Sequence, residues 1–220
     1  MKEGRVLLAS CALLMLFICI VTIFWQMQLR YLQPTPLPKG HQQVPVNSPV
    51  ASHLPGVELR GRLSLLHFFN PDCPCSKFNL QHFESLLSRY NEEVDFYVVV
   101  QTDKSNYKAD AALKASQAVI LNDHDGSIAD RCGVFATPQA VILDAEGRII
   151  YRGNYNKARY CTSKDSWFAQ QVLDARLGRS EETLLEASAT IPYGCNLPSD
   201  KDALDDAVRS LFAVIESKIP

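Results

Sequence analysis

Hydrophobic side chains dominate the N-terminal stretch of the chain, which carries no charge from residue 6 to residue 29. A helix rises about 1.5 Å per residue, so a stretch of this length crosses the roughly 30 Å hydrocarbon core of a membrane. Trp25 and Tyr31 lie near its far end, where amphipathic rings favour the membrane interface. The pattern predicts a transmembrane anchor over residues 1–31.

Two processed forms compete with an uncleaved anchor. The apolar region of a cleaved signal peptide is typically about 7–15 residues long and ends in small residues. Here the apolar run continues through residues 24–27 without a small-residue cleavage site. Residues 8–11 resemble a lipidation motif, but the apolar stretch before Cys11 is too short for one. We therefore expect a retained span, in which Cys11 and Cys19 are small apolar residues facing lipid.

The next segment, residues 32–56, is rich in proline. Half of the chain's 12 prolines fall here, and proline fixes the backbone φ angle and removes a hydrogen-bond donor. We expect an extended tether without a core of its own. The remaining residues, 57–220, are enough for one well-buried core.

Within residues 57–220 the hydrophobic pattern alternates between strand and helix. Continuous apolar runs at residues 63–69 and 94–100 predict buried strands, and helical spacing predicts a helix over residues 75–90 between them. This order indicates an α/β domain, a mixed sheet flanked by helices, with a helical extension from about residue 154. Further elements are predicted at residues 108–116 (helix), 119–121 (strand), 127–132 (helical turn), 139–151 (hairpin), 165–177 (helix) and 200–217 (helix).

Charge excludes one class of function and favours an orientation. The formal net charge is −2 and no run of Lys or Arg is present, which argues against a nucleic-acid surface. Lys2 and Arg5 precede the predicted span, whereas Arg30 and Lys39 follow it, so the positive-inside bias is slight. We expect a single-pass protein of the inner (plasma) membrane, with its domain facing the periplasm or the exterior.

Cys73, Pro74 and Cys75 stand where the predicted strand at residues 63–69 gives way to a predicted helix. The first turn of a helix has unpaired N–H groups and a partial positive charge, which stabilise a thiolate. Pro74 suits this turn because its missing N–H is not needed there. The pattern predicts reactive cysteines, although an ionised Asp72 close to Cys73 would oppose the effect.

The stretch Phe-Phe-Asn-Pro-Asp-Cys-Pro-Cys-Ser-Lys at residues 68–77, and the later Thr137-Pro138 followed by a strand, resemble the thioredoxin-like superfamily. The nearest branch is that of the membrane-tethered redoxins and thiol-specific-antioxidant relatives, and the resemblance covers residues 57–153. It implies a thioredoxin-like mixed sheet, a cis Pro138 beside the reactive cysteine, and Thr137 backbone groups that hold an incoming peptide or thiol. It also implies protein thiols or disulfides and an unidentified redox partner, with no dissociable cofactor.

The chain departs from the superfamily's cysteine pair, which has two residues between its members. Aligned on Cys73, the second position is Ser76, and Cys75 falls one residue early. Three interpretations stay open at this point. Cys73 and Cys75 form an easily reduced disulfide, Cys73 acts with a distant resolving cysteine, or the pair has lost catalysis.

Three further cysteines lie in the domain. Cys132 is expected to be a small buried apolar residue. Cys161 and Cys195 lie in the C-terminal extension, and because exported domains commonly carry disulfides, a Cys161–Cys195 bridge is expected. The sequence Tyr193-Gly194-Cys195 also resembles a C-terminal Gly-Cys of some redoxin relatives, which would instead make Cys195 a resolving thiol.

Two other classes of function compete with disulfide exchange. Cys73 and Cys75 with a histidine could hold a soft ion such as copper(I), but His67 and His82 are expected to be packing residues. No zinc pattern is present, and no metal site is predicted. Peroxidases of this superfamily place Thr or Ser three residues before the reactive cysteine, whereas Asn70 stands there before Cys73.

The sequence therefore predicts a membrane-tethered thiol–disulfide oxidoreductase of the reductase or isomerase type. Cys73 would attack as the thiolate, Cys75 would resolve the mixed disulfide, and Thr137 and Pro138 would bind the substrate. A non-catalytic or copper-handling module on the same fold, and a thiol peroxidase, are the alternatives.

Overall fold

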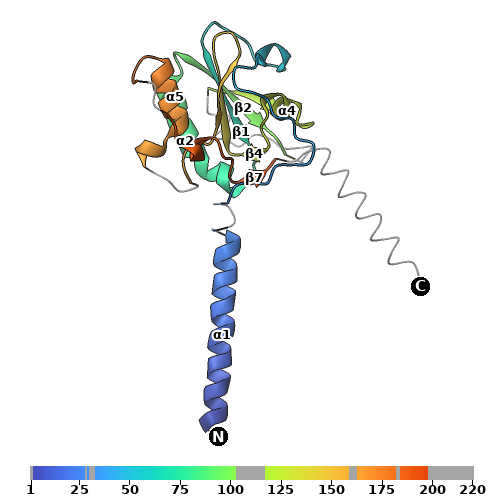
Figure 1. Cartoon of the computed structure of the whole chain (residues 1–220), viewed down its shortest axis with the longest axis vertical. Helices are drawn as coiled ribbons and strands as arrows, with labels where there is room; N and C mark the ends of the chain where they lie inside the picture. The colour runs from blue at the N-terminus through green and yellow to red at the C-terminus, as the bar shows by residue number, and fades with distance from the viewer. Residues whose placement is uncertain are drawn as a thin grey trace, which may run out of the picture.

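The computed structural model describes residues 2–27, 29, 33–102, 117–158, 163–181 and 184–197. Helix α1 (Lys2–Met27) occupies the predicted anchor and stands apart from the domain (Figure 1). Its segment Glu3–Gln26 is long and apolar enough to cross a membrane, and none of it is buried. The length and composition of α1 therefore fit the expected single span.

In the described part of the chain, five strands form one mixed sheet in the order β3-β2-β1-β5-β6. β2 lies parallel to both β1 and β3, whereas β5 is antiparallel to both β1 and β6. β1 and β2 are central and buried on both faces, which explains their nearly unbroken apolar runs. The strands are β1 (Leu63–Phe69), β2 (Val94–Val100), β3 (Val119–Asn122), β5 (Gln139–Leu143) and β6 (Ile149–Gly153).

Helices cover both faces of this sheet. α2 (Pro74–Tyr90) connects β1 to β2 and packs with α5 (Phe168–Arg176) on one face. α4 (Ser127–Cys132) packs on the opposite face (Figure 1). The expected architecture, a mixed sheet flanked by helices, is confirmed.

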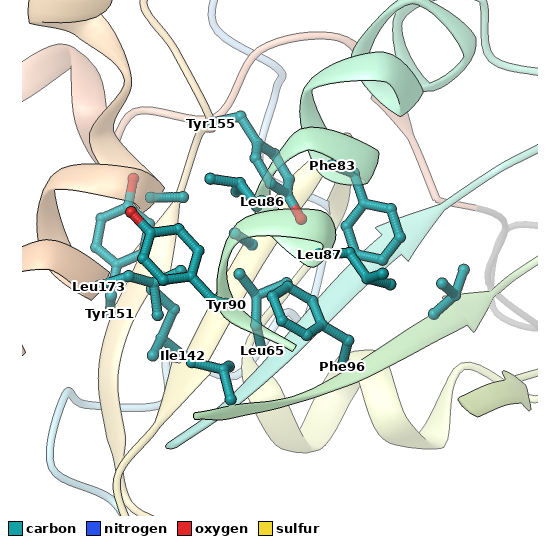
Figure 2. Packing of buried hydrophobic residues seen from close by; sticks show 14 of the residues in the cluster. Leu65, Phe83, Leu86, Leu87, Tyr90, Phe96, Ile142, Tyr151, Tyr155 and Leu173 are labelled. Atoms are coloured by element: carbon teal, nitrogen blue, oxygen red, sulfur yellow. The ribbon is translucent and has the colours of Figure 1, made fainter. Parts of the chain in front are cut away.

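The larger hydrophobic cluster fills the space between α2, α5 and the sheet (Figure 2). Phe83 and Tyr90 of α2 are fully buried in this cluster. Leu65 of β1 and Leu173 of α5 pack against the same group. The apolar residues whose spacing predicts the helix therefore also form the face by which α2 packs against the sheet.

The second cluster, on the α4 face, includes part of the segment that was expected to lack a core. The 3-10 helix η2 (Ala51–His53) carries Ala51 into this cluster, with Val50 and Leu54 beside it. The backbone N–H of Val50 also donates to the turn between β5 and β6. The prediction for residues 32–56 is therefore wrong in its second half, because apolar side chains between the prolines cover the sheet.

A second, two-stranded sheet joins distant parts of the chain. β4 (Ala136–Thr137) pairs antiparallel with β7 (Cys195–Asn196). Just before β7, Tyr193 forms an isolated antiparallel bridge with Pro34, in the segment that follows α1. The stretch after α1 therefore contacts the stretch that carries Cys195.

The remaining predicted elements have mixed outcomes. The β5–β6 hairpin and α4 are confirmed. The predicted helix at residues 165–177 is interrupted, because Trp167 has non-helical backbone angles between the 3-10 helix η3 (Lys164–Ser166) and α5. The predicted helices at residues 108–116 and 200–217 lie outside the described residues.

Replacing Phe83 with alanine is expected to lower the free energy of unfolding by about 3–5 kcal/mol, because it leaves a cavity in the larger cluster. Phe78 lies on the same helix but is 53% exposed, so Phe78→Ala is the matched control and should change stability by less than about 1 kcal/mol. Denaturant unfolding of the detergent-solubilised chain, followed by tryptophan fluorescence, measures both. Equal losses for the two variants would contradict the packing described here.

Candidate functional site

Cys73 stands at the junction of β1 and α2. It is the N-cap residue of α2 and has extended backbone angles, and Pro74 is the first residue of the helix. The Cys73 N–H closes the preceding turn by donating to the Asn70 carbonyl at 3.1 Å. Cys73 therefore sits where the first helical turn offers unpaired N–H groups and a positive dipole end to a thiolate.

The Thr137–Pro138 peptide bond is cis, as the resemblance implied. The Thr137 carbonyl oxygen lies 3.6 Å from Cys73 Sγ. The Thr137 hydroxyl donates to the Phe68 carbonyl at 2.9 Å and also contacts the Ser76 hydroxyl. Because Thr137 is fully buried, its side chain fixes the cis-proline turn against both the end of β1 and the start of α2.

A disulfide joins Cys73 to Cys195, 122 residues further along the chain. β7 places Cys195 directly opposite Thr137, and the two Cα atoms of the disulfide are 6.0 Å apart. The expected Cys161–Cys195 bridge is wrong, because Cys195 is bonded to Cys73; Cys161 lies outside the described residues. Cys73 is thus bonded to a distant cysteine and not to Cys75.

Cys75 is a buried cysteine in the first turn of α2 that is not part of a disulfide. Its Sγ lies within 4.8 Å of both sulfurs of the disulfide. The structure therefore brings three sulfurs together, two from the predicted Cys-Pro-Cys motif and one from the C-terminal segment.

Cys132, at the end of α4, has a different environment. It is fully buried in the cluster on the α4 face. Burial, with a smaller effect from the charge of Asp123, raises the pKa of the Cys132 thiol to about 12. Such a thiol is not nucleophilic at neutral pH, so the expectation of a small buried apolar residue is confirmed.

The two histidines considered as metal ligands lie between β1, α2 and α5. His67 stacks on Phe83 with 4.5 Å between ring centroids, and its Nδ1 shares a hydrogen bond with the Tyr155 hydroxyl at 2.8 Å. Burial, and to a lesser extent the charge of His82, lowers the pKa of His67 to about 3. His82 packs on Trp167, and burial lowers its pKa to about 4. Both are packing residues, as expected, and neither belongs to the three-sulfur group.

Contacts other than the disulfide hold the segment at residues 192–197 in place. The Leu197 N–H donates to the Phe135 carbonyl at 3.0 Å, next to the β4–β7 pair. Gly194 has a φ of +114°, and a Cβ at this position would collide with the Thr137 carbonyl oxygen. Only glycine has both the backbone freedom and the small size for this approach.

A family model described as a domain of unknown function, DUF6436, matches residues 43–196, which is more than half of the chain. The chain belongs to the DUF6436 family. The matched stretch includes the buried linker residues, the cis proline and both cysteines of the disulfide. No curated protein matches the sequence.

Several solved structures are similar to the DUF6436 chain. A hypothetical protein from Sinorhizobium meliloti has a TM-score of 0.51 and 22% identity, over 63% of this chain and 80% of its own. An uncharacterized conserved protein from Geobacillus kaustophilus has a TM-score of 0.50 and 20% identity, over 62% and 77%. A putative thioredoxin from Neisseria meningitidis has a TM-score of 0.41 and 18% identity, over 56% and 79%. The strand order, the cysteine at the start of α2 and the cis proline before β5 make the DUF6436 fold thioredoxin-like.

Sequence reasoning found only part of this DUF6436 site. It singled out Cys73, Thr137 and Pro138, and the structure brings these three together. It missed the pairing of β7 with β4 and the close approach of Gly194 to Thr137. A signal was present in the Gly-Cys resemblance at Cys195, but no local pattern shows which strand this segment joins.

Acidification is expected to destabilise the DUF6436 domain through His67. Its pKa is about 3 in the folded state against 6.5 as the ordinary value, so below about pH 6.5 the unfolded state binds a proton that the folded state does not. Stability should therefore fall as pH falls through this window, by roughly 2 kcal/mol at pH 5 for this group. Unfolding free energies of wild type and His67→Gln at pH 7 and 5 test this. The same pH dependence in both proteins would contradict it.

Gly194→Ala is expected to push β7 away from β4 and so to disfavour the Cys73–Cys195 disulfide by roughly tenfold in its equilibrium constant with glutathione. Gly178→Ala is the matched control, because Gly178 also has a positive φ but a Cβ added there would meet no atom within 4 Å. Alkylation of free thiols followed by mass spectrometry gives the oxidised fraction. If both variants shifted the disulfide equilibrium equally, the cause would be backbone strain alone and not the collision with Thr137.

Proposed function

We propose that this DUF6436 chain is a thiol–disulfide oxidoreductase, tethered to a membrane by α1. One observation carries the proposal: the Cys73–Cys195 disulfide lies at the N-terminus of α2, beside the cis Thr137–Pro138 bond. The helix N-terminus stabilises Cys73 as a thiolate, which makes it both a good nucleophile and a good leaving group.

In the reducing half of the cycle, an external dithiol supplies two electrons. One of its thiolates attacks Cys195, which is half-buried whereas Cys73 is only 2% exposed. The Cys73–Cys195 bond breaks, Cys73 leaves as the thiolate, and a mixed disulfide forms on Cys195. The second thiol of the donor then resolves this mixed disulfide, which leaves the donor oxidised and both cysteines reduced.

In the other half of the cycle, the Cys73 thiolate attacks a disulfide of a substrate protein. One substrate thiol leaves, and the mixed disulfide now lies on Cys73. Cys195 attacks Cys73, releases the second substrate thiol and restores the Cys73–Cys195 bond. The disulfide thus favours Cys195 over Cys75 as the resolving thiol.

The position of β7 affects how a protein substrate reaches the site. The resemblance implies that Thr137 backbone groups hold an incoming peptide, and in this structure β7 pairs with that strand. An extended substrate segment therefore competes with β7 for β4. Reduction removes the covalent link, after which only backbone and packing contacts retain β7.

The disulfide also supports the proposed location. Structural and catalytic disulfides persist in oxidising compartments, which supports a domain on the exported side of the membrane, in the periplasm or at the exterior. The redox partner is then a dithiol that is accessible from that side.

Insulin reduction by the detergent-solubilised full chain, with dithiothreitol as donor, tests the assignment. Cys73→Ser should lower turnover roughly 100-fold, because the attacking thiolate is lost. Cys195→Ser, reduced and then freed of dithiothreitol, should trap insulin as a mixed disulfide on Cys73, visible on a non-reducing gel. Cys75→Ser should keep most of the wild-type turnover.

Buried Cys132, whose thiol lies outside the three-sulfur group, provides the control: Cys132→Ala should still form the disulfide and turn over insulin. The opposite pattern, in which Cys75→Ser is inactive and Cys195→Ser is fully active, would assign the exchange to Cys73 and Cys75. Full activity of Cys73→Ser would reject the proposed function.

A further inference from the structure

The three-sulfur group, Cys73, Cys75 and Cys195, has the composition of a metal site. Each pair of its Sγ atoms lies within 4.8 Å, and the group includes no histidine, aspartate or glutamate. Two of the residues are buried, and Cys195 is half-buried, so the group is shielded from water but can be reached from one side. Disulfide exchange between Cys73 and Cys195 uses only two of the three sulfurs.

The donor set selects among metal ions. Thiolates are soft ligands and favour copper(I), whereas calcium, magnesium and manganese prefer oxygen. Structural zinc sites are almost always four-coordinate, and this group offers three protein ligands. We propose that, once the Cys73–Cys195 disulfide is reduced, Cys73, Cys75 and Cys195 together bind one copper(I) ion. The copper site shares Cys73 and Cys195 with the proposed exchange activity, but it also needs Cys75, which that activity does not require.

The distances fit a trigonal arrangement of three sulfurs around one ion. With metal–sulfur bonds of about 2.3 Å, the sulfurs of such a site are about 4 Å apart. The Cys75 sulfur already lies within 4.8 Å of the other two. Only Cys73 and Cys195 have to separate from their bonded distance, which a change of side-chain rotamers allows.

Backbone contacts keep Cys195 at the site without the covalent bond. The β4–β7 pair sets Cys195 opposite Thr137, and the Leu197 N–H donates to the Phe135 carbonyl at 3.0 Å. Just before β7 in the chain, the Tyr193 hydroxyl donates to Asn156 Oδ1 at 2.7 Å. None of these contacts involves a sulfur of the disulfide, so they can hold the third ligand in position after reduction.

The charge of the loaded site is compensated locally. A copper(I) ion with three thiolates carries two net negative charges, and the N-terminus of α2 presents the positive end of its dipole to Cys73 and Cys75. The nearby Asp72 does not belong to the sulfur group, and its Oδ2 accepts a hydrogen bond from the Thr102 hydroxyl at 3.5 Å.

The oxidation state of the disulfide controls the site. An external dithiol transfers two electrons to the Cys73–Cys195 bond, becomes a disulfide itself and leaves two thiols on this chain. Copper(I) then displaces the protons that the three cysteines still carry and forms three copper–sulfur bonds. The oxidised protein has only the Cys75 thiol left in the group, so it lacks the site.

Anaerobic titration of the reduced, detergent-solubilised full chain with copper(I), against a chromophoric copper(I) chelator, tests the proposal. Wild type should bind one equivalent, and X-ray absorption should count three sulfurs around the ion. Cys75→Ser should weaken binding by at least roughly tenfold and leave two sulfur ligands, while the Cys73–Cys195 disulfide still forms on reoxidation.

Cys132→Ala is the matched control, since it removes a buried thiol outside the group and should leave copper(I) affinity unchanged. Copper(I) affinity should also disappear from wild type that is oxidised before titration. Two results would overturn the proposal: two sulfurs or fewer around the ion in wild type, or the same affinity in Cys75→Ser. Neither result affects the proposed function, because the insulin assay that tests it does not need Cys75. If Cys75→Ser does not fold, the sulfur count in wild type decides alone.

Discussion

The attachment of the C-terminal segment to the start of α2 is the interaction on which the site depends. A single disulfide links Cys73 to Cys195, and the β4–β7 pair aligns the two sulfurs by placing Cys195 opposite Thr137. The buried Thr137 side chain in turn ties the cis-proline turn to the end of β1 and to α2. Three distant parts of the chain are thereby fixed around one cysteine.

The same attachment connects the site to the segment that follows α1. The Thr35 N–H donates to the Pro192 carbonyl at 2.8 Å, and Pro34 bridges to Tyr193. These residues lie between α1 and the core on one side, and directly before β7 on the other. The segment that follows α1 therefore contacts the residues directly before Cys195 and helps to hold them in place. The proline-rich stretch thus has a structural role beyond that of a spacer.

Much of the fold follows from local sequence patterns. Side-chain periodicity matches backbone geometry, so it predicts which elements form and which faces are buried. Examples are the apolar runs of β1 and β2 and the spacing of Phe83 and Tyr90 in α2. The buried part of the tether was missed. The prolines indicate an extended backbone there. Whether Val50 packs against the sheet depends on the tertiary path of the chain, which the local sequence does not show.

The sequence by itself determined the long apolar helix α1, the strand and helix order, and the position of Cys73 at the start of α2, since each depends on residues that are close together in the chain. The tertiary structure alone decided the partner of that cysteine and the position of Cys75 next to both sulfurs. A contact across 122 residues is set by how the sheet, the cis-proline turn and the returning C-terminal segment pack, and no local pattern carries that information.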